Sequence, residues 1–195
     1  MKLFSYLFFV LLSTSAMAQH SGDGAAAAGG APPEANQFDF LVGQWQLDVT
    51  PKVSGLAAMI HGTPKLVGTW KAWRVMDGTA LEDEMRIFDA SGNPASATRT
   101  LRMYARGEGR WKVVGIDTYH GRSSESSAQQ HGAEMQIDGH FTGGEGKQTL
   151  TRTRYFAISA DAFRMQQDRS ADNGQTWDEA VLTIDAKRTA ATATP

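Results

Sequence analysis

The sequence predicts an all-β protein, an antiparallel up-and-down β-barrel of about 8–10 strands. Turn signals such as Asp77-Gly78 and Asn173-Gly174 recur along the chain, and these residue types tolerate the positive φ that hairpins require. Apolar and polar residues alternate between the turns, as they do along strands with one buried face. Closing such a meander into a cylinder removes its exposed edges, so a barrel is favoured over an open sandwich.

About nine runs between these turns have the length and the residue types of strands. They are rich in β-branched and aromatic residues, and no fixed repeat of a propeller or solenoid is visible. The expected strands span 44–50, 65–76, 79–89, 98–105, 110–119, 133–141, 147–159, 162–169 and 176–187.

The N-terminus predicts export. Lys2 precedes an apolar run over 3–12, and Ala16-Met17-Ala18 forms a small-residue cleavage site, so 1–18 is interpreted as a signal peptide. The protein is therefore expected to be secreted, with the periplasm as its compartment. The segment 19–35 is predicted to be a flexible Gly/Ala/Pro tether, 36–188 the barrel, and 189–195 a disordered tail.

Composition narrows the function classes. The chain has no cysteine, which excludes disulfides and a lipid-attachment cysteine. Its formal net charge is -2, and neither sign forms a long block, so nucleic-acid binding is not expected. The apolar run at the N-terminus is too short to cross a bilayer, so no membrane insertion is expected after signal cleavage. The sequence indicates no particular oligomeric state.

Residue parity predicts which side chains face the lumen, because neighbours in a strand point to opposite faces. Trp45, Leu47 and Val49 share one face of the first strand. Arg188 lies on the corresponding face of the last strand, which pairs with the first strand in a closed barrel. A guanidinium over the Trp45 ring is therefore expected at the seam, worth about 0.5–2 kcal/mol.

Two strands carry charges on their apolar face. Asp83 shares its parity with Leu81, Met85 and Ile87, and Arg152 and Arg154 share theirs with Leu150 and Phe156. Burial of charge costs several kcal/mol unless the groups pair, so an inward acid and inward bases would mark either a paired network or the polar part of a binding cavity.

A lumen cavity would have aromatic and methionine walls with a few orienting polar groups, which is the usual composition of a small-molecule site. The sequence thus predicts a small apolar or amphipathic ligand. The connection 51–64 is longer than a hairpin needs and is a candidate lid. The candidate ligand-binding residues are Asp83, Tyr104, Trp111, Arg152, Arg154 and Phe163.

Two other function classes remain open. A barrel enzyme of the cyclase, isomerase or decarboxylase type would use Asp83 with Tyr104 or Arg152, because an apolar lumen raises the pKa of a carboxyl group. A structural or interaction module would instead have a lumen filled by its own side chains. The histidines lack the spacing of a zinc site, and a haem would need His120 or His140, so no cofactor is predicted.

One further motif is local. Residues 170–177 match the S-x-D-x-G-x-T-W pattern of an Asp-box, which occurs once here. Its Ser and Asp side chains bond turn amides, and Gly174 takes positive φ. A glycosidase propeller would need several copies, so a structural hairpin is the expectation.

Several segments of the sequence carry a family resemblance. They are the opening FDFLVGQW, Asp77-Gly78 followed by Glu82-Asp83-Glu84, the strand LRMY at 101–104, Gly109-Arg110-Trp111, and the end from Phe163 to Trp177 closed by Arg188. The sequence resembles a family of secreted or periplasmic bacterial lipocalin-like domains of unestablished function. The resemblance covers nearly the whole mature chain and implies a calycin-type barrel. With true lipocalins the shared positions are Gly43, Trp45 and Arg188.

Overall fold

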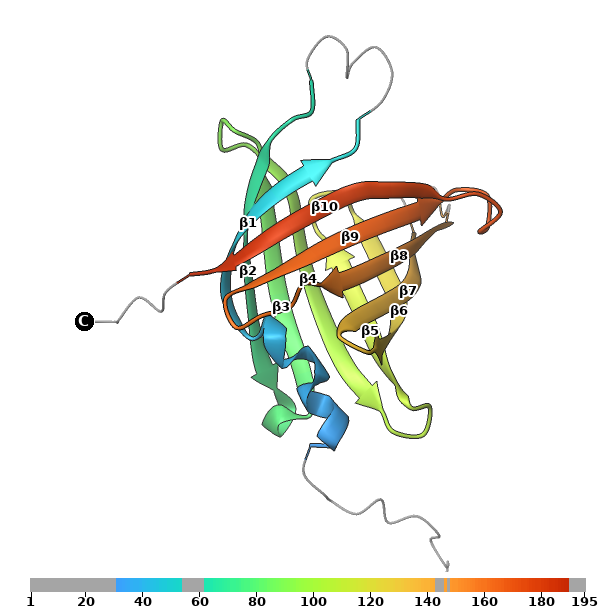
Figure 1. Cartoon of the computed structure of the whole chain (residues 1–195). Helices are drawn as coiled ribbons and strands as arrows, with labels where there is room; N and C mark the ends of the chain where they lie inside the picture. The colour runs from blue at the N-terminus through green and yellow to red at the C-terminus, as the bar shows by residue number, and fades with distance from the viewer. Residues whose placement is uncertain (1–30, 54–61, 143–145, 147, 190–195) are drawn as a thin grey trace, which may run out of the picture.

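The protein forms a closed barrel of ten antiparallel strands (Figure 1). The computed structural model describes residues 31–53, 62–142, 146 and 148–189. Each strand pairs with the strands that precede and follow it in sequence, and the first strand pairs with the last. The predicted all-β, up-and-down barrel is confirmed.

The elements follow one another around the barrel in chain order. A 3₁₀ helix, η1, covers one end of the barrel, and a one-turn 3₁₀ segment, η2, joins the second and third strands (Figure 1). The bounds are η1 Pro33–Leu41, β1 Gly43–Pro51, β2 Leu66–Val75, η2 Met76–Gly78, β3 Ala80–Phe88, β4 Pro94–Ala105, β5 Arg110–Asp117, β6 Arg122–His131, β7 Glu134–Thr142, β8 Gln148–Phe156, β9 Ala162–Ser170 and β10 Asp178–Arg188.

The seam between β1 and β10 closes as the residue parity predicts. Trp45 is opposite Arg188 in the register, and the Arg188 Cζ lies 4.0 Å from the centroid of the Trp45 ring. The same guanidinium donates to the Val42 carbonyl through Nη1 at 2.7 Å. Gly43 has φ +127°, and a Cβ there would lie 2.3 Å from Arg188 Nη1, so only glycine fits at the start of β1.

All nine expected strands are present, and a tenth strand, β6, was missed. Its sequence, RSSESSAQQH, lacks the β-branched and aromatic residues that usually identify a strand. Its lumen-facing positions include Ser124 and Ser126, which line a polar cavity, so no apolar alternation could reveal it. β4 also begins earlier than expected, at Pro94.

The predicted domain boundary at residue 36 falls within the first described element. η1 starts at Pro33, and Ala35 is buried. The predicted signal peptide at 1–18, most of the tether, the centre of the predicted lid at 54–61, and 190–195 lie outside the described residues.

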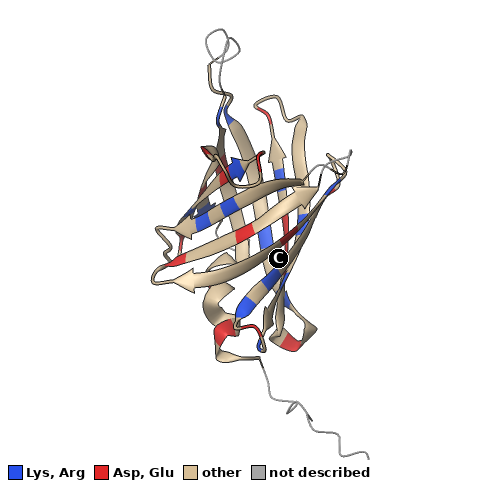
Figure 2. Cartoon of the chain, turned by 90° about the vertical axis from the view of Figure 1, so that its right-hand side faces the viewer, with Lys and Arg blue, Asp and Glu red and all other residues tan. Residues whose placement is uncertain are grey.

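Acidic and basic residues are interspersed along the strands (Figure 2). Many of them pair across neighbouring strands, as Arg164 does with Asp185 at 2.7 Å and Arg99 with Glu82 at 2.6 Å. Such exposed pairs contribute about 0–1 kcal/mol each. The fold is therefore stabilised chiefly by its lumen core and its hydrogen-bonded strand ladder.

Candidate ligand-binding site

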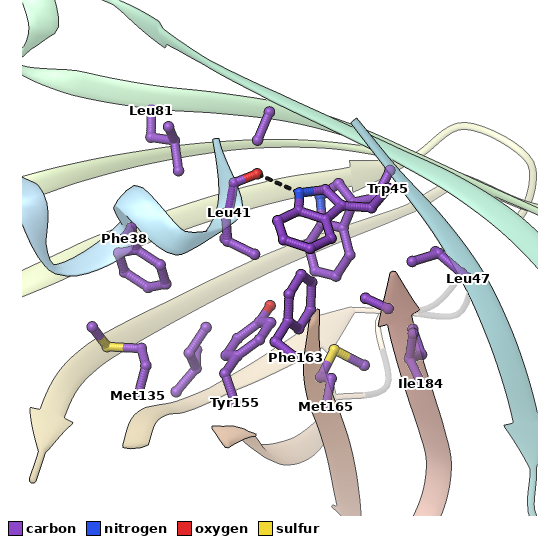
Figure 3. Close-up of a cluster of buried hydrophobic side chains, with 14 of the residues drawn as sticks. Phe38, Leu41, Trp45, Leu47, Leu81, Met135, Tyr155, Phe163, Met165 and Ile184 are labelled. Atoms are coloured by element: carbon purple, nitrogen blue, oxygen red, sulfur yellow. Dashed lines mark hydrogen bonds between the residues drawn. The ribbon is translucent and has the colours of Figure 1, made fainter. Parts of the chain in front are cut away.

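One end of the lumen is filled. η1 inserts Phe38 and Leu41 among the aromatic side chains of the barrel, and Trp45 Nε1 donates to the Leu41 carbonyl at 2.7 Å (Figure 3). The Phe38 ring meets Trp111 edge-on at 4.9 Å, and Trp45 meets Phe163 at 4.8 Å. Edge-to-face contacts of this kind add about 0.5–1.5 kcal/mol each to simple burial.

Polar contacts hold η1 in place. Arg74, at the end of β2, donates through Nη2 to the Ala35 carbonyl at 2.9 Å and forms an ion pair with Asp39. Trp111 Nε1 donates to Gln37 Oε1 at 2.9 Å. These bonds and the aromatic contacts hold η1 in place, so η1 closes this end of the barrel. This closed end is called the floor.

The other half of the lumen is hollow. A cavity of about 350 Å³ lies between the floor and the opposite barrel end, so the alternative of a wholly filled lumen is wrong. Part of its wall is apolar and comes from β2, β3 and β10, which lie on the same side of the barrel with β1 between β10 and β2. These side chains are Leu182, Leu66, Met85 and Ile87.

The rest of the cavity wall is largely polar. β4, β6, β8 and β9 contribute mainly serines, threonines, a glutamine and arginines, and apolar side chains of β5, β7 and β9 lie among these, including Val113, Ile137, Phe141 and Met165. Gly115 and Gly139 lie beside the β6 serines, and a Cβ at Gly139 would fall 2.0 Å from Ser126 Oγ. The polar wall comprises Ser96, Thr98, Thr100, Ser124, Ser126, Thr151, Thr153 and Gln167, with Arg122 and Arg169.

A buried ion pair lies on the floor side of the cavity. Asp83 and Arg102 are 1% and 3% exposed and pair through Oδ2 and Nη1. Trp70 Nε1 donates to the other Asp83 oxygen at 2.9 Å. All three residues line the cavity together with Tyr155. The expected inward position of Asp83 is confirmed, and its counter-charge comes from β4.

The buried environment changes the proton affinities of this cluster. Burial lowers the pKa of Arg102, and the Tyr155 hydroxyl partly opposes that change. Burial raises the pKa of Tyr155, against the influence of Arg102. Among the described residues, Arg102 Nε has no hydrogen-bond partner, so it is a donor that a bound ligand could use.

The six predicted ligand-binding residues do not come together. Asp83 lines the cavity, whereas Trp111 and Phe163 belong to the packed floor. Tyr104 packs against Trp111, with ring centroids 5.7 Å apart, and does not reach the cavity.

The inward prediction for Arg152 and Arg154 is wrong. Their side chains are 55% and 42% exposed and form loose ion pairs with Asp138 and Glu134 on the outer face. The inward positions of β8 are instead Thr151, Thr153 and Tyr155.

The error on β8 has a physical cause. The strand faces a polar cavity, so its inner residues are threonines, while apolar residues cover the outside. Leu150 lies under the hairpin that follows β9, and Arg152 stacks on the Trp177 ring at 3.8 Å. Apolar residues therefore mark the outer face here, which inverts the parity rule.

The sequence did not predict several other residues that line the cavity. Arg102 shares its parity with Tyr104, which was expected to face inward, so a signal for it was present. Arg122 is the first residue of β6 and Arg169 is next to last in β9, and both strands have a weak hydrophobic alternation. β6 is also the strand that was not predicted. His120 also lines the cavity, with its Nδ1 2.7 Å from Asp117, whereas His140 lies outside it.

The Asp-box forms the expected structural hairpin. Ser170 Oγ accepts from the Gly174 amide at 2.8 Å, and Asp172 accepts from the Thr176 amide at 2.9 Å and from its hydroxyl at 2.6 Å. These bonds, those of Thr176 first, lower the pKa of Asp172 to about 2. Asn173 and Gly174 both take positive φ.

The described part of the chain contains neither a metal-binding cluster nor a membrane-spanning helix. No group of three or more His, Cys, Asp or Glu is arranged to hold a metal ion. No helix there is long and apolar enough to span a membrane.

Comparison with known proteins establishes the architecture. No protein-family model and no curated protein matches the chain. The structure is similar to the S-type phycobiliprotein lyase CPES from Guillardia theta, with a TM-score of 0.50 and 12% identity over 80% of this chain and 92% of that one. At this identity the likeness shows the fold alone, a calycin-like barrel.

Two further solved structures are more distant. A fluorescence-activating β-barrel designed de novo has a TM-score of 0.37 and 9% identity over 77% of this chain and 95% of that one. EF1p2_mFAP2b bound to DFHBI has a TM-score of 0.39 and 11% identity over 80% of this chain and 98% of that one. The site is therefore interpreted from its own geometry.

Proposed function

We propose that the barrel binds a small amphipathic molecule in its lumen. The observation that carries this proposal is that one side of the cavity is mainly apolar and the other is rich in hydroxyl groups and arginines. A cavity of about 350 Å³ is within the usual range for small-molecule sites. Its floor is anchored by η1, so the site is largely formed before a ligand arrives.

The polar wall selects against a purely apolar ligand. Such a ligand would displace water from the hydroxyl groups of Ser126, Thr98 and Thr100 and from Gln167 without replacing the hydrogen bonds. Leaving a buried polar group unpaired costs about 1–3 kcal/mol. A ligand with one apolar side and one hydrogen-bonding side satisfies both walls.

The same geometry does not favour the enzyme alternative. A general acid or base needs a carboxyl group that can exchange a proton with substrate. Asp83 is held by Arg102 and Trp70, and the other expected catalytic residues, Tyr104 and Arg152, do not line the cavity.

We also propose that the protein is exported and that it belongs with the secreted lipocalin-like domains that its sequence resembles. The sequence of 1–18 supports export, and the calycin-like barrel supports the family assignment. A binding protein of the periplasm is the combined proposal. N-terminal sequencing of protein from a periplasmic fraction tests it, with Gln19 as the expected first residue and Met1 as the contradicting result.

Titration with N-phenyl-1-naphthylamine tests ligand binding. This uncharged fluorophore brightens in an apolar site, and we expect saturable binding to the purified protein. Ser126→Phe fills the lumen side of β6, and Ser127→Phe places the same ring on the outer face of that strand. The first variant should weaken binding about tenfold or more and the second less than about twofold. Absence of saturable binding, or equal loss in both variants, would contradict the proposal.

A further inference from the structure

Two arginines meet on one aromatic ring where the lumen opens. Arg122 is the first residue of β6, Arg169 is next to last in β9, and Phe141 lies on β7. The guanidinium carbons lie 5.2 Å and 5.4 Å from the centroid of the Phe141 ring. All three residues line the cavity, at the end opposite the η1 floor. The lumen therefore has two cationic groups at its mouth.

Within the described residues, Arg122 and Arg169 each lie opposite an aspartate in the strand register, Asp117 and Asp178, but neither arginine pairs with it at ion-pair distance. Arg169 donates through Nε and Nη2 to one neutral acceptor, Gln167 Oε1, at 3.0 Å each, and neither arginine forms an ion pair there. Both carboxylates have other partners, and Asp117 itself lines the cavity. Asp117 binds His120 at 2.7 Å, and Asp178 binds Lys52 at 2.7 Å.

Arginines on the outer face are different. Arg86, Arg99 and Arg164 each have a carboxylate oxygen within 2.7 Å. Acidic residues are thus available to this chain, and they neutralise the outer arginines rather than the two at the mouth. At the mouth the two guanidinium groups outnumber the one lining carboxylate, Asp117, and low-dielectric walls strengthen the field of the remaining positive charge.

The two cations also act on each other. Burial and the charge of Arg122 lower the pKa of Arg169, and Asp178, its register partner on β10, opposes this. Two like charges on one ring are an unfavourable arrangement that a bound anion would relieve. Guanidinium groups bind planar oxyanions through paired hydrogen bonds, which suits carboxylate, sulfonate and phosphate groups.

We propose that Arg122 and Arg169 form an anion subsite that holds the oxyanion head group of the lumen ligand. This inference rests on the proposed lumen binding and specifies its ligand as an amphipathic anion. The head group lies between the arginines near Phe141, and the apolar part extends toward Met85 and Ile87 on the opposite wall. Small amphipathic acids are the chemical class that this arrangement fits.

A pair of matched probes tests the subsite. 8-Anilinonaphthalene-1-sulfonate has the ring system of N-phenyl-1-naphthylamine with one sulfonate added. We expect the native protein to bind the sulfonate about tenfold more tightly than the neutral probe. In the double variant Arg122→Met, Arg169→Met this ratio should fall to about one, while binding of the neutral probe changes less than about twofold.

Control variants separate charge from folding. Arg164→Met removes an arginine from the outer face of β9 and should leave both affinities unchanged. Arg122→Lys with Arg169→Lys keeps the charge and should retain part of the preference for the sulfonate. Because methionine preserves contact with Phe141 and removes like-charge repulsion, the double methionine variant should melt no lower than the native protein.

The outcomes distinguish the two proposals. If neither probe binds, lumen binding fails and the subsite fails with it. If the neutral probe binds but the native protein shows no preference for the sulfonate, or keeps its preference in the double methionine variant, the subsite alone is overturned. Displacement of the sulfonate by an equal concentration of inorganic phosphate would overturn its assignment to a ligand head group, because a free anion would then be the preferred occupant.

Discussion

The buried ion pair between Asp83 and Arg102 offers the most quantitative test of the lumen's energetics. Both side chains are almost fully buried, so removing either one leaves the other charge without compensation. Breaking such a pair costs about 3–5 kcal/mol. For a domain of this size, that corresponds to a fall in melting temperature of about 6–20 °C.

The double variant should behave differently. Asp83→Leu with Arg102→Met removes both charges and fills the space with apolar atoms, so the remaining losses are the acceptor for Trp70 Nε1 and the Arg102 partner of the Tyr155 hydroxyl. One unpaired buried donor costs about 1–3 kcal/mol. The double variant is therefore expected to be more stable than either single variant, with a coupling of several kcal/mol.

Urea unfolding followed by tryptophan fluorescence measures these free energies, with calorimetry as an independent check. Asp83→Asn completes the set, because it removes the charge and keeps an oxygen acceptor for Trp70. Single variants that each cost less than about 1 kcal/mol would refute the reasoning. So would a double variant whose cost equals the sum of the two single costs.

Two other predictions concern the seam and the hairpin. Trp45→Ala should cost about 3–5 kcal/mol in urea unfolding, because the ring is buried under Arg188 and against Phe163, whereas Gln46→Ala on the outer face should be nearly neutral. A small loss for Trp45→Ala would contradict the seam model. Asp172 should titrate near pH 2 by carboxyl ¹³C NMR. Since its folded pKa lies below the usual value, its stabilisation of the hairpin is complete above about pH 4 and is lost as the pH falls toward 2. Thr176→Val should move the midpoint upward, and an unchanged midpoint would count against the assigned hydrogen bonds.

Much of the fold could be predicted from residue parity and turn chemistry. Parity placed Trp45, Leu47, Val49 and Asp83 correctly, because their strands have one apolar lumen face. It also aligned Arg188 with Trp45, because residues directly opposite each other on paired antiparallel strands point to the same face of the sheet. These predictions succeed where the lumen is a conventional hydrophobic core.

The same rule fails around the cavity. A strand that lines a polar lumen needs small hydroxyl residues inside, so β6 has no apolar alternation, and β8 shows apolar residues on the wrong face. Arg152 and Arg154 were therefore assigned inward, and the true lumen arginines, Arg102, Arg122 and Arg169, were not identified. A hydrophobic pattern cannot reveal a site whose distinguishing property is that it interrupts the hydrophobic core.

The central claim is that the hollow half of the barrel, with its two unlike walls, is the site of ligand binding. A crystal structure of the protein with bound 8-anilinonaphthalene-1-sulfonate tests this claim most directly. The account predicts density for the rings beside Met85 and Ile87, with the sulfonate within hydrogen-bond distance of Arg122 and Arg169. Density on the outer face of the barrel, with the lumen unchanged, would contradict it.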